Sequence, residues 1–210
     1  MKLEGKRICF LGDSITEGVG TSAPDKTYHQ IIAKEYNLER AYNFGVGGTR
    51  IARQTNVSVY PVWDLFFELR AETMPRDTDA IVVFGGTNDY GHGDAPFGEL
   101  DSNDVYTFCG AVNSLITFLE KNFPNSEKVF VTPLHRVSEN APSQPDGKVL
   151  ADYVDAMRQI CKKRGVALVD LFDIAPIDPK NPAHVPDGLH PNNAGHEIIA
   201  DVIAKELLKL

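Results

Sequence analysis

Residues 7–18 read RICFLGDSITEG, an apolar run that passes directly into glycine and polar residues. The run Arg7 to Leu11 is short and almost entirely apolar, which is typical of a parallel strand buried on both faces. The next residues, Gly12 to Gly18, place a turn between this strand and a following helix. A strand that leads at once into a helix is the first part of a βαβ unit, so this stretch predicts an α/β fold.

The same alternation continues to the end of the chain. Four more short apolar runs predict strands at Arg40 to Phe44, Ala80 to Phe84, Lys128 to Thr132 and Ala167 to Leu171. Apolar residues at three- and four-residue spacing predict helices over Tyr28 to Tyr36, Pro61 to Met74, Val105 to Phe123, Leu150 to Cys161 and from about Ala194 onward, the last capped by Asn192 or Asn193. No repeat or hydrophilic linker divides the chain. We therefore expect one domain, residues 1–210, built as a three-layer α/β/α sandwich around a five-stranded parallel sheet of the flavodoxin-like kind.

The composition excludes several kinds of partner. Acidic residues outnumber basic ones by 29 to 21, and the net charge of −8 is spread along the chain, so nucleic acid is not an expected partner. The first apolar stretch, Ile8 to Leu11, is too short for a signal-peptide core or a membrane span, so we expect a cytoplasmic protein without membrane contact. The three cysteines, Cys9, Cys109 and Cys161, lie far apart among apolar neighbours, which predicts reduced core residues.

Ser14 stands at the predicted turn between the first strand and its helix. The unpaired N–H groups of a helix start can stabilise a negative oxygen that develops on a substrate, so this is a suitable place for a nucleophile. The spacing Ser14-x-x-Glu17 fits a capping box equally well, in which the hydroxyl only satisfies a backbone donor.

A serine nucleophile needs a base, and the sequence offers His190 in Asp187-Gly188-Leu189-His190. A tight turn at Gly188 would let the Asp187 carboxylate reach one imidazole nitrogen and leave the other for Ser14. The alternative is a plain surface turn. Histidines also recur every six residues at His184, His190 and His196, but this is not a zinc-ligand spacing, so no metal is expected.

Two glycine-rich segments follow the second and third predicted strands. They read Gly45-Val46-Gly47-Gly48-Thr49 and Gly85-Gly86-Thr87-Asn88-Asp89. Neither has the order of a dinucleotide fingerprint or a phosphate-binding loop, so no organic cofactor is expected. Both allow close backbone approach at the carboxyl edge of the sheet, and the second places the Asn88 amide near Ser14. A purely structural turn is the alternative for each.

These four segments together resemble the SGNH, or GDSL-like, hydrolases. Gly12-Asp13-Ser14 matches the first family block, Gly48 the second, Gly86-Thr87-Asn88-Asp89 the third and Asp187 to His190 the last. The resemblance implies that Ser14 is the nucleophile, His190 the general base and Asp187 its partner. It also implies an oxyanion hole formed by the Ser14 and Gly48 N–H groups and the Asn88 side chain. The family often has Ser-Gly-Asp in its second block where this chain has Gly47-Gly48-Thr49, which leaves the choice between Gly47 and Gly48 open.

The expected activity is hydrolysis of a carboxylic ester through an acyl-enzyme. Because the loops Tyr90 to Ser102 and Arg136 to Lys148 are polar, we expect a small ester, such as a short-chain acyl ester or an acetylated carbohydrate. Acyl transfer by the same acyl-enzyme and a non-catalytic carbohydrate-binding relative are the alternatives. Residues expected near the pocket are Tyr90, His92, Phe97, His135 and Arg136, with loop packing as an equal alternative. Trp63, with Phe66, Phe67 and Leu69 around it, is expected in the core; an exposed Trp63 would instead suggest a homo-oligomer interface.

Overall fold

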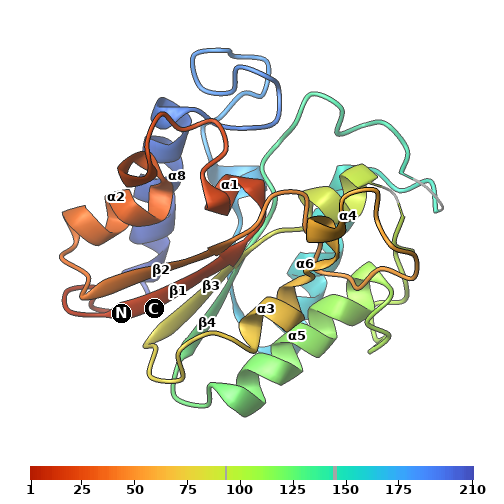
Figure 1. Cartoon of the computed structure of the whole chain (residues 1–210), viewed down its shortest axis with the longest axis horizontal. Helices are drawn as coiled ribbons and strands as arrows, with labels where there is room; N and C mark the ends of the chain where they lie inside the picture. Colours follow the sequence, from red (N-terminus) through yellow and green to blue (C-terminus); the bar gives the residue numbers. More distant parts are fainter. Residues whose placement is uncertain (93, 144–145) are drawn as a thin grey trace.

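The computed structural model describes residues 1–92, 94–143 and 146–210, and its centre is a five-stranded parallel sheet in the order β2-β1-β3-β4-β5 (Figure 1). The strands are β1 (Arg7–Gly12), β2 (Arg40–Gly45), β3 (Ala80–Phe84), β4 (Glu127–Val131) and β5 (Ala167–Val169). All five predicted strands are therefore present, with ends shifted by up to two residues. β5 is shorter than predicted because Leu171 already begins a helix. This strand order is the flavodoxin-like one, as predicted.

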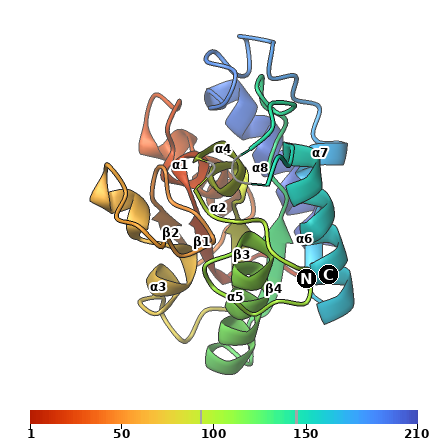
Figure 2. The same ribbon diagram turned by 90° about the vertical axis from the view of Figure 1, so that its right-hand side faces the viewer.

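Both faces of the inner strands β1 and β3 are buried, which explains why these strands are almost entirely apolar, whereas the edge strand β2 is only partly buried. Alternate residues point to opposite faces: Cys9 and Leu11 pack into one apolar cluster, whereas Ile8 and Phe10 pack into the other. Helices cover each face and complete the three layers (Figures 1 and 2). The first cluster lies under α3 (Phe67–Ala71), α5 (Phe108–Asn122) and α6 (Leu150–Arg164), and the second under α2 (Tyr28–Glu35) and α8 (Asn193–Leu207).

The remaining helices are short and lie mostly at the carboxyl edge of the sheet. They are α1 (Ser14–Glu17), η1 (Pro24–Lys26), η2 (Pro61–Asp64), α4 (Thr87–His92) and α7 (Leu171–Ile174). Asn192 caps α8, since its side chain accepts a hydrogen bond from the Gly195 N–H at 3.2 Å. Of the two asparagines predicted as possible caps, Asn192 is the one that caps the helix.

The prediction of one helix over Pro61 to Met74 is wrong. The chain forms η2 and α3 instead, and Leu65 between them has ψ of 65°, outside the helical region. The Leu65 carbonyl accepts from Arg70 Nε at 2.8 Å, and the Phe67 N–H donates to the Arg50 carbonyl at 3.1 Å. This local side-chain bond and the bond to the Arg50 carbonyl replace the helical hydrogen bonds that the apolar spacing suggested.

The three cysteines are free and buried, as predicted. Burial raises the pKa of Cys9 to about 11 and the pKa values of Cys109 and Cys161 to about 12, so these thiols are protonated and inert at neutral pH. No helix in the described ranges has the length and apolar character that a membrane span requires.

Two buried histidines lie between α2, α8 and the sheet. His196 Nδ1 accepts from the Tyr28 N–H at 3.1 Å, and His29 Nε2 lies 3.1 Å from the Thr16 carbonyl, which requires an N–H there. Burial lowers the pKa of each to about 4, so both imidazoles are neutral in the folded protein. Keeping a histidine neutral in the core costs no stability while the same histidine is also neutral in the unfolded chain, and it costs stability at a pH where the unfolded histidine is protonated.

We expect His196 to make the fold acid-sensitive. Its folded pKa lies below the unfolded value of 6.5, so its contribution is complete above pH 6.5 and is lost as the pH falls toward 4. The loss amounts to at most about 3 kcal/mol. His196→Asn keeps an acceptor for the Tyr28 N–H but does not titrate. Urea unfolding at several pH values should show that the variant is less stable than wild type at pH 7 and that the difference in free energy of unfolding narrows toward pH 4. A difference that stays constant with pH would contradict the lowered pKa of His196.

Candidate active site

Ser14 is the first residue of α1, at the carboxyl end of β1, an inner strand between β2 and β3. The helix is capped by Asp13, whose Oδ1 accepts from the Ile15 N–H at 3.0 Å. Glu17 does not complete a capping box either, because its carboxylate accepts from the Gly47 N–H at 2.8 Å. The capping alternative for Ser14 is therefore wrong, and its hydroxyl is left for another partner.

That partner is His190, which comes from the far end of the chain. Ser14 Oγ lies 3.0 Å from His190 Nε2, and His190 Nδ1 lies 2.7 Å from Asp187 Oδ2. The predicted tight turn is present, since Gly188 has φ of +78°, a conformation that glycine adopts without strain. The structure thus brings together the three residues that the sequence singled out. A histidine in this position can take a proton from the hydroxyl while the carboxylate holds its tautomer.

The Asp187 carboxylate is bound from several directions. Partial burial raises its pKa, but its hydrogen bonds lower the pKa by more. Its Oδ1 accepts from the His190 N–H at 2.7 Å and from the Leu189 N–H at 2.9 Å, and the His190 ring binds the other oxygen. The pKa of Asp187 is consequently lowered to about 2. The carboxylate is therefore ionised wherever the histidine could act as a base.

The glycine-rich loop after β2 lies beside Ser14. A Cβ placed on Gly47 would be 3.6 Å from Ser14 Cβ, and a Cβ on Gly48 would overlap the Trp63 indole. Gly48 also has φ of +74°, so both space and backbone conformation favour glycine there. Because Glu17 accepts from the Gly47 N–H, the Gly48 N–H is the one without an acceptor in the described part of the chain.

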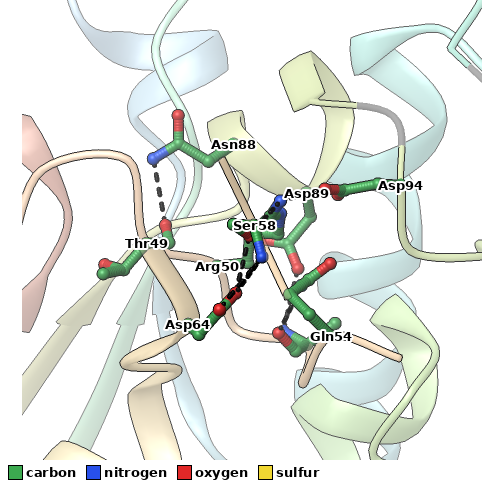
Figure 3. Close-up of polar contacts among 9 residues, drawn as sticks. Thr49, Arg50, Gln54, Ser58, Asp64, Asn88, Asp89 and Asp94 are labelled. Atoms are coloured by element: carbon green, nitrogen blue, oxygen red, sulfur yellow. Dashed lines mark hydrogen bonds and ion pairs between the residues drawn. The ribbon is translucent and has the colours of Figure 1, made fainter. Parts of the chain in front are cut away.

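Asn88 lies in the first turn of α4, after β3, and is 7% exposed. Its Nδ2 donates to the Thr49 carbonyl at 2.9 Å, as Figure 3 shows. An amide carries two N–H bonds, so one remains for a further acceptor. The Ser14 N–H, at the start of α1, also makes no hydrogen bond inside its helix. Ser14, Gly48 and Asn88 thus each follow the end of one of three adjacent strands.

A buried arginine, which the sequence analysis did not single out, joins these strand ends. Arg70 from α3 is 8% exposed and donates to the Gly12 carbonyl and to Thr49 Oγ1, both at 2.9 Å, and to the Phe44 carbonyl. It therefore links the ends of β1 and β2 to the loop beyond Gly48. No local sequence pattern indicates this, because the hydrogen-bonded groups are distant in the chain.

Trp63 is not a core residue, which corrects the prediction. It is half-buried and lies against Gly48. Its ring centroid is 4.8 Å from that of Tyr60 and 4.3 Å from that of His92. Phe67 is fully buried, as expected, whereas Leu69 is exposed. The tryptophan therefore forms one wall of the candidate site.

Loop packing explains several residues that were expected near the pocket. Tyr90 is buried and donates to the Ser138 and Ala141 carbonyls, and Phe97 packs against Tyr153 with ring centroids 5.1 Å apart. His135 instead pairs with Glu139 at 2.8 Å. Arg136 Nη1 donates to the carbonyl of Thr87, the residue before Asn88, at 3.1 Å. Residues 93, 144 and 145 of these two loops lie outside the described residues.

The profile of the GDSL-like Lipase/Acylhydrolase family matches residues 10–198, which include every residue of this site. The chain belongs to this family. It is accordingly a carboxylic-ester hydrolase, and the resemblance seen in the sequence is confirmed. A search of curated proteins gives no significant match. No group of three or more potential metal-ligating side chains occurs among the residues that the structure describes.

Solved structures agree with the family at the level of the fold. A protein from Lactobacillus plantarum is 34% identical over 98% of both chains, with a TM-score of 0.83. A putative GDSL-like lipase from Bacteroides ovatus is 23% identical over 98% of this chain and 99% of its own, with a TM-score of 0.73. A mutant of an acetyl-xylooligosaccharide esterase from Geobacillus stearmophilus is 21% identical over 99% and 96%, with a TM-score of 0.64.

Proposed function

We propose that this GDSL-like acylhydrolase cleaves a small carboxylic ester through an acyl-enzyme on Ser14. The observation that carries the proposal is the unbroken chain of hydrogen bonds from Asp187 through His190 to Ser14. Serine is a weak nucleophile at its own pKa and is activated by an adjacent base. A binding protein has no need of such a chain, which argues against the non-catalytic alternative.

In the proposed reaction Ser14 Oγ attacks the ester carbon and its proton passes to His190 Nε2. The negative oxygen of the tetrahedral intermediate accepts from the Ser14 and Gly48 N–H groups and the second N–H of Asn88. Collapse breaks the bond to the alcohol oxygen, which leaves with the proton from His190. Water then attacks the acyl-enzyme, again with His190 as base, and releases the acid and free Ser14.

The substrate that we propose is a short-chain acyl ester or an acetylated carbohydrate. The structurally similar Geobacillus enzyme is named an acetyl-xylooligosaccharide esterase, and this supports a sugar ester. Trp63 beside Gly48, with Tyr60 packed against it, would offer an aromatic surface to the alcohol part. Acyl transfer to an alcohol would use the same acyl-enzyme and remains the alternative that the test below separates.

The test is a panel of nitrophenyl acetate, butyrate and octanoate together with acetylated xylooligosaccharides. We expect turnover to be highest for acetyl esters and the product to be free acid, even with an added acceptor alcohol. A fluorophosphonate probe should label Ser14, as located by peptide mass spectrometry. Absence of turnover on every ester, or labelling at a residue other than Ser14, would refute the proposal; a new ester formed with the acceptor would favour acyl transfer.

A further inference from the structure

Two residues of α4 hold the loop that follows Gly48. Asn88 Nδ2 donates to the Thr49 carbonyl at 2.9 Å. The neighbouring Asp89 accepts from two successive backbone N–H groups, from Ile51 on Oδ2 at 3.0 Å and from Ala52 on Oδ1 at 2.9 Å. Figure 3 shows these side chains reaching from α4 to the loop. Three hydrogen bonds therefore join the first turn of α4 to three residues of the loop, Thr49, Ile51 and Ala52.

We propose that Asp89 is a positioning residue for ester hydrolysis, which holds the Gly48 N–H and the Asn88 amide at the separation that one oxyanion requires. The inference rests on the proposed function, since it assigns Asp89 to the same oxyanion hole. Asp89 does not itself contact the reacting atoms and acts only through the loop and the helix.

The sheet alone cannot fix this separation. Gly48 follows β2 and Asn88 follows β3, and these strands are not neighbours, because β1 lies between them. No strand-to-strand hydrogen bond therefore links the two donors directly. Each also lies three or four residues beyond its strand end, where the ladder no longer constrains the backbone. A bridge between loop and helix is needed, and Asp89 provides two of its three hydrogen bonds.

The bridge is rigid because of its burial and its geometry. Asp89 is 0% exposed, so water does not compete for its oxygens. Its two oxygens each bind one N–H of the same loop, which defines the orientation of the carboxylate as well as its distance. Burial raises the pKa of Asp89 to about 6, and the two loop N–H groups and the nearby buried Arg50 offset part of this rise. Arg50 lies in the same loop segment and is itself held by Ser58 and Asp94 (Figure 3).

Asp89→Asn tests the positioning role with little change of shape. The amide has one acceptor oxygen and one donor nitrogen, so one of the two loop N–H groups must lose its partner and face another donor. We expect kcat to fall by on the order of 10- to 10²-fold, because an error of about 1 Å in a catalytic group can have this effect. KM should change by less than about threefold, since the hole binds the transition state rather than the ester.

Asp79→Asn is the matched control. Asp79 also accepts from a backbone N–H, that of Arg7 at 2.8 Å, and lies beside a cation, Lys6 at 2.9 Å. It precedes β3, at the opposite edge of the sheet from the site. We expect this variant to lose stability without losing kcat. Rates are divided by the concentration of sites that the fluorophosphonate labels, so that partial unfolding does not lower the measured kcat.

A double-mutant cycle with Asn88→Ala separates positioning from a general loss of order. If Asp89 acts by aligning the two donors, Asp89→Asn should lower kcat much less in the Asn88→Ala background than in wild type. Equal factors in both backgrounds would overturn the proposal, as would wild-type kcat per labelled site in a folded Asp89→Asn protein.

Asp89→Glu keeps both acceptor oxygens but moves them by one methylene, and it replaces Asp89→Asn if that variant does not fold. It should also lower kcat, and wild-type kcat in the folded variant would overturn the proposal.

Failure of this inference is distinct from failure of the proposed function. In the first case the wild type is active and Ser14 is labelled, but the Asp89 variants keep wild-type kcat, as Asp79→Asn does. In the second case the wild type itself does not hydrolyse esters.

Discussion

Replacing Ser14 by alanine should lower kcat for ester hydrolysis by about 10⁴-fold or more, while the protein stays folded. The substitution removes Ser14 Oγ, which lies 3.0 Å from His190 Nε2. Among the described contacts of this nitrogen, it is the only oxygen that could form an acyl-enzyme. Loss of a serine nucleophile in comparable triads lowers kcat by about 10⁶-fold, and binding and the oxyanion hole account for the activity that remains. The measurement is the initial rate on nitrophenyl acetate, with labelling by the fluorophosphonate as a second readout.

Ser126→Ala is the control for this prediction. Ser126 is similarly buried, at 6% exposed against 7% for Ser14, and its hydroxyl donates to the Thr78 carbonyl at 2.7 Å near the start of β4. It should reduce stability slightly and leave turnover unchanged. If Ser14→Ala kept more than about one-tenth of the wild-type kcat, Ser14 would not be the nucleophile.

Asn88→Ala should lower kcat by about 10²- to 10³-fold, the usual effect of removing one oxyanion donor. The loss should be in kcat, with little change in KM, because the negative charge exists only in the transition state and the intermediate. The side chain also donates to the Thr49 carbonyl, so some loss of stability is expected as well. Steady-state kinetics on acetyl esters gives kcat and KM separately.

Asn122→Ala is matched to Asn88→Ala, since Asn122 Nδ2 also donates to a backbone carbonyl, that of Phe118, at 2.9 Å. It lies at the end of α5, away from the strand ends that carry the site. Thermal unfolding of both variants shows how much of any loss comes from stability. A rise in KM with unchanged kcat for Asn88→Ala would mean that Asn88 binds the ester in its ground state and is not an oxyanion donor.

Much of the fold is predictable because its signals are local. Parallel strands that are buried on both faces are continuously apolar, as β3 is. Short apolar runs located all five strands to within two residues, although the edge strand β2 is only partly buried. The failure at Pro61 to Met74 has an equally clear cause. Apolar spacing describes which face a helix buries, but it contains no information on the side chain of Arg70, which binds the Leu65 carbonyl and interrupts the helix.

The sequence by itself determined which residues could form the site, because Ser14 follows directly on a strand and Asp187 and His190 share one turn. Only the tertiary structure decided how they are used. It placed Asp13 rather than Ser14 as the helix cap, and it paired the Gly47 N–H with Glu17, while the Gly48 N–H has no acceptor among the residues that the structure describes. A local pattern restricts what a residue can do, but its hydrogen-bond partner depends on segments that only folding brings together.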